Sequence, residues 1–147
     1  KALALNLRDY GGMGYPIHDI ENDFEDLGEV IWDHATGLMW QKSGSEDFRP
    51  YTQAQEYIDQ LNNDTFAGYE DWRLPTIPEL MSLLEPEENE YGLYINPMFD
   101  KHQAWCWSAD KRSSWSAWRV HFDYGHVGWL IVGSSDYVRA VRSWRAP

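Results

Sequence analysis

The sequence predicts an α+β fold in which two helices pack on twisted antiparallel β-sheets. Three observations predict it. Apolar residues recur at helical spacing in two short stretches, apolar and polar residues alternate on either side of them, and glycine-containing turns join the alternating stretches. A chain of 147 residues is long enough for one domain with its own core. We expect residues 28–147 to form that domain and residues 1–27 to form an N-terminal arm, either packed on the domain or solvated.

The first alternating stretch, EVIWDHATGLMWQ, predicts a β-hairpin. Val30 and Trp32 alternate with the residues between them, and the return strand begins at Leu38. The intervening DHATG segment is typical of a turn, because Gly37 accepts a positive φ without steric cost. This hairpin precedes both expected helices.

Each expected helix begins with a capping box. Thr52 with Gln55, and Thr76 with Glu79, have the spacing at which the two residues satisfy each other's backbone N–H groups. Pro78 falls in the first turn of the second helix, where a missing N–H costs little. The apolar faces of the two helices are expected to comprise Ala54, Tyr57, Ile58 and Leu61, and then Leu80, Leu83 and Leu84.

The stretch from Trp105 to Arg142 predicts the remaining strands. Residues of one strand alternate between Trp118, Val120 and Phe122 on one side and Arg119, His121 and Asp123 on the other. The DYGH turn at 123–126 leads to a return strand that divides into Val127, Trp129 and Ile131 against Gly128, Leu130 and Val132. We expect Val127 and Ile131 in the core and Leu130 and Val132 at the surface. An outward Trp129 would require a twist or bulge. Tyr137 to Arg142 is expected to form the last strand.

The net charge of −12 is unevenly distributed along the chain. Residues 1–100 carry a balance of −16, and residues 101–147 carry a balance of +4. The acidic part argues against nucleic acid as a partner. The basic part either faces an anionic ligand or pairs with the acidic part, and the second interpretation assigns Arg139 and Arg142 to intramolecular ion pairs. The sequence also contains no apolar run long enough to span a membrane.

No residue pattern predicts a catalytic centre or a cofactor. The single cysteine, Cys106, lies between two tryptophans, which suits a buried apolar residue better than a reactive thiolate. His121 and His126 face each other across a hairpin, but a metal site would need Asp123 as its third ligand. We therefore expect neither a metal site nor an enzyme. The acidic residues from Glu85 to Glu90 have no calcium-loop spacing and are expected to form a solvated loop.

Six segments carry a resemblance to a known family. They are TGLMWQ (36–41), the helix at 52–62, GYEDWRLPTIPEL (68–80), WCWSAD (105–110), AWRVHFDYG (117–125) and YVRAVR (137–142). In this order they resemble the C-terminal domain family of the Legionella collagen-like protein, over about residues 28–143. The resemblance implies a C-type lectin-like fold. The chain lacks the disulfide cysteines and calcium motifs of animal C-type lectins, so no calcium-dependent sugar site is carried over.

The resemblance also implies a function. Members look like ligand-binding or adhesion domains for proteins, sugars or glycosaminoglycans at a cell surface or outside the cell, and some form trimers. The same fold carries the variable proteins of diversity-generating retroelements, and a related fold serves formylglycine-generating oxidases, which is the less favoured reading. By position, the implied contact set is Asp110, Lys111, Arg112, Trp115, Arg119, His121, Asp123, Tyr124, His126, Gly128, Trp129, Leu130 and Val132.

Overall fold

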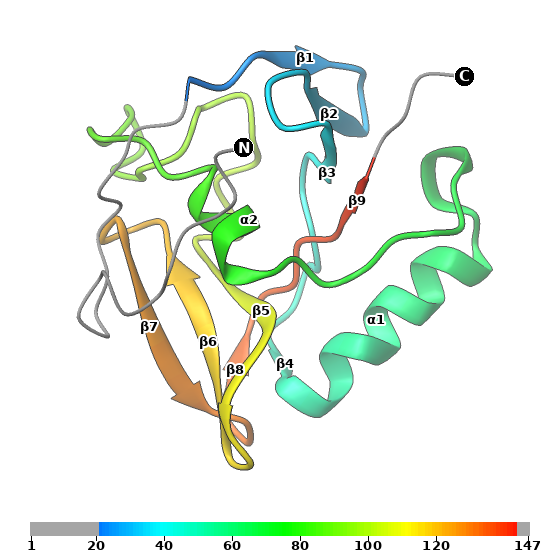
Figure 1. Cartoon of the computed structure of the whole chain (residues 1–147), viewed down its shortest axis with the longest axis vertical. Coiled ribbons are helices and arrows are strands. Elements are labelled where there is room, and N and C mark those ends of the chain that lie inside the picture. The colour runs from blue at the N-terminus through cyan, green and yellow to red at the C-terminus, as the bar shows by residue number, and fades with distance from the viewer. Residues whose placement is uncertain (1–20, 144–147) are drawn as a thin grey trace.

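The computed structural model describes residues 21–143, which form three antiparallel sheets and three helices (Figure 1). The β5–β6–β7 sheet stands at one side of the molecule, and α1 lies at the opposite side (Figure 1). In chain order the elements are β1 Phe24–Asp26, β2 Val30–Asp33, β3 Leu38–Gln41, β4 Arg49–Pro50, α1 Tyr51–Asn63, η2 Phe66–Gly68, α2 Ile77–Met81, β5 Trp105–Ser113, β6 Ser116–His121, β7 His126–Ile131, β8 Ser135–Asp136 and β9 Val141–Ser143.

The first sheet has the strand order β1-β2-β3-β9 and closes the molecule, because β3 pairs with the last strand of the chain. The predicted hairpin is confirmed as β2 and β3, with Gly37 at a φ of 74° in its turn. Within the expected N-terminal arm, β1 pairs with β2, and residues 1–20 lie outside the described residues. The boundary at residue 28 stays a prediction.

Helix α1 forms as predicted but is capped differently. It begins at Tyr51, one residue before the expected cap, and Pro50 occupies the N-cap position without any side-chain hydrogen bond. The Tyr51 N–H donates instead to the Val132 carbonyl at 3.0 Å. The expected capping box at Thr52 and Gln55 is therefore wrong, because a contact from the end of the β6–β7 hairpin already satisfies the first N–H of the helix.

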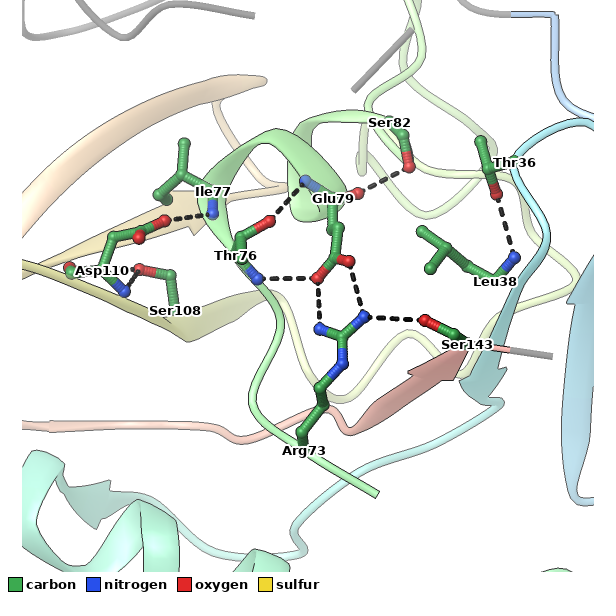
Figure 2. A network of polar contacts seen from close by, with 10 residues as sticks. All are labelled: Thr36, Leu38, Arg73, Thr76, Ile77, Glu79, Ser82, Ser108, Asp110 and Ser143. Carbon is green, nitrogen blue, oxygen red and sulfur yellow. Dashed lines mark hydrogen bonds and ion pairs between the residues drawn. The ribbon is translucent and has the colours of Figure 1, made fainter. Parts of the chain in front are cut away.

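The capping box of α2 is confirmed in full. The Thr76 hydroxyl accepts from the Glu79 N–H, and the Glu79 carboxylate accepts from the Thr76 N–H at 2.9 Å (Figure 2). The same carboxylate accepts two bonds of 2.7 Å from the Arg73 guanidinium. Arg73 also pairs through its backbone with Val141 of β9. A helix of five residues is thus anchored to the closing sheet by charge-assisted hydrogen bonds.

Core residues cover both faces of the β5–β6–β7 sheet. On one face Cys106, Val120 and Val127 are buried in a cluster that also contains α2 residues such as Ile77 and Leu80. The other face contributes buried residues to a second cluster, built around Trp107, Ala117, Ala54, Ile58 and Trp72. The sheet is consequently a central layer for much of its length.

The C-terminal segment is more broken than predicted. A single strand over Tyr137–Arg142 is wrong, since regular pairing is limited to β8 and β9. Arg142 pairs with Asp71 at 2.6 Å, as expected. Arg139 meets no carboxylate among residues 21–143; its buried guanidinium donates to the carbonyls of Gln41, Lys42 and Asp100. The Lys42 and Asp100 carbonyls come from loops around the residue, and the Gln41 carbonyl comes from the end of β3.

The α+β class is confirmed by these mixed helices and antiparallel sheets, although the helical part is small. The more specific C-type lectin-like fold stays a prediction. None of the helices between residues 21 and 143 is long and apolar enough to cross a membrane.

Candidate functional site

The exposed residues of the predicted contact set lie at the two ends of the β6–β7 hairpin. An uninterrupted antiparallel register, from His121–His126 to Ser116–Ile131, fixes both ends. The β5–β6 hairpin borders the second end and contains two register shifts around Lys111. Large side chains therefore project from a regular pair of strands. We call the two groups the tryptophan cluster (Arg112, Trp115, Trp129 and Ile131) and the histidine cluster (Arg119, His121, Asp123, Tyr124 and His126).

In the tryptophan cluster a cation lies between two exposed rings. The Arg112 guanidinium carbon is 4.2 Å from the centroid of the Trp129 ring and 5.9 Å from that of Trp115. The two indoles meet edge to face, with their centroids 5.8 Å apart. Trp115 is 51% exposed and Trp129 is 42% exposed. A cation over an indole face is attractive, and this arrangement leaves a large, ordered apolar surface in water.

Trp129 reaches the surface without the bulge that an outward position was expected to require. It lies on the same side of β7 as buried Val127, as strict alternation dictates, and pairs directly with Trp118. Helix α2 contacts this sheet mainly at β5 and β6. Trp129 and Ile131 are exposed because the core on this side ends before the end of β7.

The core assignment of Ile131 is wrong for this reason, and its two neighbours are less exposed than expected. Ile131, expected in the core, is 51% exposed. Leu130 and Val132, expected at the surface, are partly buried and pack against the cluster around Trp107 and Ala117. The alternation of β7 is real, but the second core lies on the side that a single-core domain would leave in water.

The histidine cluster is a chain of polar contacts. Arg119 donates to the buried Asp136 carboxylate at 2.9 Å and also contacts His121 Nε2 at 2.6 Å. Because a guanidinium only donates, Nε2 of His121 must accept, and the ring proton must reside on Nδ1. The proton points toward Asp123, whose Oδ1 lies 3.3 Å from Nδ1. The Tyr124 and His126 rings stack with centroids 5.7 Å apart, and Tyr124 is 64% exposed.

Burial and charge set the protonation of this cluster. Burial, followed by the positive charge of Arg119, lowers the pKa of His121 to about 4, so the imidazole is neutral at pH 7. Burial raises the pKa of Asp136 to about 7 even though Arg119 opposes the shift. The geometry accounts for this direction: only Oδ1 meets Arg119, and Oδ2 is buried without a hydrogen-bond partner among the described residues.

Three further members of the predicted set are not counted in the two clusters. Asp110 accepts from the Ile77 N–H at 2.7 Å and so holds the start of α2 (Figure 2). Gly128 is buried in β7 beside the His121 ring. Lys111 is exposed on β5. Asp110 therefore has a structural role, and any contact with a ligand would involve a carboxylate that already holds α2.

Metal and thiol chemistry find little support within residues 21–143. No group of three His, Cys, Asp or Glu side chains in this range is arranged to hold a metal ion. Arg119 also directs its positive charge at His121 Nε2, the nitrogen that a metal would need. Cys106 is fully buried, and burial raises the pKa of its thiol to about 12. A thiolate at this position would be strongly disfavoured at neutral pH.

A second aromatic surface was missed from the sequence. Phe48 is 49% exposed and lies over Tyr137 and Trp105, with ring centroids 4.4 and 5.7 Å away. Trp105 pairs with His121 across the sheet, so this surface adjoins the histidine cluster. The polar context of Phe48 in the KSGSEDFRPY loop was the available signal, since an aromatic residue there has no periodic partner.

A comparison with curated proteins gives no match. The family model for the Lcl C-terminal domain matches residues 29–142, which run from the start of β2 into β9. The match covers most of the chain and includes every segment on which the sequence resemblance rests. The chain belongs to the Lcl C-terminal domain family.

Proposed function

We propose that this protein is a non-enzymatic recognition domain of the adhesion type that binds its ligand with the exposed side chains of the β5–β6–β7 sheet. The observation that carries the proposal is the exposure of Trp115, Tyr124 and Trp129 at the β5–β6 turn, at the β6–β7 turn and on β7. Burying an exposed aromatic ring in a contact lowers the free energy, because its apolar surface leaves water. An aromatic side chain has only two side-chain torsions, so it loses little entropy on binding. Membership of the Lcl C-terminal domain family supports a surface-associated, adhesion-type role.

The ligand we propose is a protein or a glycan presented on a surface. Both use aromatic rings as anchors and arginine as a hydrogen-bond donor, and Arg112 lies over Trp129 where it serves either purpose. A non-enzymatic role is supported by buried Cys106, because the oxidases of the related fold rely on cysteine chemistry. Neutral His121 is likewise tied to Arg119 and Asp123 rather than to a nucleophile.

A hypervariable surface of the retroelement type is the more specific form of this proposal. Trp115, Tyr124, Trp129 and Ile131 are exposed, whereas Asp110 and Arg119 make contacts that hold the fold. We therefore expect variation at the first group and constancy at the second. The test is the surrounding DNA: a near-repeat of the segment encoding 105–142, with substitutions confined to adenines and beside a reverse transcriptase, would support it, and absence of the repeat would contradict it.

The proposed contact surface can be tested with paired alanine variants. Trp129→Ala and Tyr124→Ala remove one exposed ring from each cluster, and Tyr91→Ala removes an equally exposed ring from the acidic loop. Binding on glycan and protein arrays should fall about tenfold or more for a cluster variant and stay unchanged for Tyr91→Ala. Circular dichroism checks that each variant is folded. Unchanged binding by both folded cluster variants would refute the contact surface.

A further inference from the structure

Strand β7 has an outer edge that pairs with no other strand among residues 21–143. Edge strands expose backbone hydrogen-bonding groups, and proteins usually protect them with charge, bulges or short length. Two other edges, those of β1 and β5, show such protection. Strand β1 has three residues, two of them acidic, and β5 contains register shifts around Lys111. Strand β7, HVGWLI, has six residues in regular register, with no Asp, Glu, Lys, Arg or proline.

The backbone of β7 directs alternate amides toward this edge. The Val132 N–H donates to the Trp115 carbonyl, and this pair continues the register of β6 and β7. The even-numbered residues of β7 therefore bond to β6. By the same alternation the N–H groups of Val127, Trp129 and Ile131 point away from β6. The Ile131 carbonyl accepts from Ser134 in the following turn, so the available groups centre on Trp129 and the Ile131 N–H.

The side chains beside this edge specify what would fit. Trp129 and Ile131 are exposed on one side of β7, so a strand added there would place apolar side chains next to them. Arg112 lies over Trp129 at 4.2 Å, and no carboxylate between residues 21 and 143 pairs with it. An acidic side chain on the added strand would meet this cation.

We propose that β7 binds an extended peptide segment of a partner protein as an additional strand, and that this segment alternates apolar residues and carries at least one carboxylate for Arg112. This deepens the proposed recognition function and rests on it. A second copy of the chain fits less well, because β7 paired with β7 supplies no carboxylate to either Arg112. Backbone hydrogen bonds would supply affinity, and Trp129, Ile131 and Arg112 would supply selectivity.

A matched pair of substitutions at Ile131 tests the backbone contribution. Ile131→Pro removes the outward N–H without removing a bond to β6, whereas Ile131→Ala removes the same side chain and keeps the N–H. The probe is a displayed library of random peptides about ten residues long, a length typical of one strand. We expect the wild-type chain to enrich alternating apolar and acidic peptides. Ile131→Pro and Arg112→Gln should each weaken the binding of these peptides about tenfold, and Ile131→Ala should weaken it less.

Hydrogen exchange supplies an independent readout. An enriched peptide should slow exchange of the Trp129 and Ile131 amides and leave the β6-bonded Leu130 amide unchanged. Enriched peptides that bind Ile131→Pro and Ile131→Ala equally, but are lost in Trp129→Ala, would overturn strand addition and leave the recognition function intact. Failure to enrich any peptide would overturn the peptide partner. A wild-type dimer that Ile131→Pro dissociates in sedimentation would overturn it in favour of a second copy.

Discussion

At the scale of single residues, the Arg119 guanidinium determines the chemistry of the histidine cluster. One cation contacts both a buried carboxylate and an imidazole, so it stabilises the ionised Asp136 and disfavours a protonated His121. Burial acts on both groups against their charged forms. The pKa of the acid is raised and the pKa of the base is lowered, so both groups favour neutrality. A recognition surface built on this network would present neutral His121 to a ligand at physiological pH.

The opposite shifts predict a specific effect of Asp136→Asn on the pH dependence of stability. Because the pKa of Asp136 is about 7 when folded and 3.8 ordinarily, its contribution to stability is fully present below the ordinary value and is lost as pH rises toward 7. His121 acts oppositely: its pKa of about 4 makes the folded state more stable as pH rises through 4 to 6.5. In Asp136→Asn the contribution that falls with pH is absent. The free energy of unfolding of this variant should therefore change more positively with pH than that of wild type.

Urea unfolding from about pH 4 to about pH 8 measures this difference. The free energy of unfolding of Asp136→Asn, relative to wild type, should increase over that range. His121→Asn is the reciprocal control: its free energy of unfolding, relative to wild type, should decrease over the same range. A constant difference between Asp136→Asn and wild type would show that Asp136 keeps an ordinary pKa.

At the scale of the element, the two expected capping boxes give a matched comparison. Thr76→Ala removes a hydroxyl that accepts from the Glu79 N–H at the start of α2, and should cost about 1 kcal/mol of stability. Thr52→Ala should show no measurable loss, because Thr52 is exposed and α1 has no side-chain cap. Chemical denaturation of both variants tests this, and equal losses would contradict the assignment of the caps.

The comparison also shows where sequence patterns are informative. Thr76, Pro78 and Glu79 satisfy one another locally, so the start of α2 was predictable. The start of α1 depends on the Val132 carbonyl, which lies 81 positions away in the chain and leaves no local pattern. The sequence did not predict the exposure of Ile131 or the partial burial of Leu130, for a similar reason. Alternation separates the two sides of a strand, but it does not say which side meets a second core or where that core ends.

The segments that carry the family resemblance are mainly structural. In the DWRLPT segment Asp71 pairs with Arg142, Trp72 is buried and Arg73 holds Glu79. These contacts explain why a recognisable segment predicted the fold better than the site. The proposed contacts at Trp115 and Trp129 lie outside all six of these segments, and Tyr124 lies in the turn between β6 and β7.

At the scale of the whole molecule, two arginines close the fold in different ways. Arg139 is completely buried and joins the end of β3, through the Gln41 and Lys42 carbonyls, to the loop at Asp100. Arg142, three positions later, forms its ion pair with a largely exposed Asp71. The bond from Arg139 to the Gln41 carbonyl is buried, whereas water screens an exposed ion pair.

Arg139→Met should therefore destabilise the protein by about 3 kcal/mol, because the Gln41 carbonyl loses its donor inside the core. Arg142→Met should cost only about 0.5 kcal/mol, because Asp71 is solvated in either state. Urea unfolding of both variants provides the measurement, and salt provides the second criterion. Added salt should narrow the difference between wild type and Arg142→Met but leave the Arg139→Met loss nearly unchanged, since screening requires solvent access. Equal losses would mean that the Gln41 carbonyl finds another donor and that β3 and the Asp100 loop are not joined through Arg139.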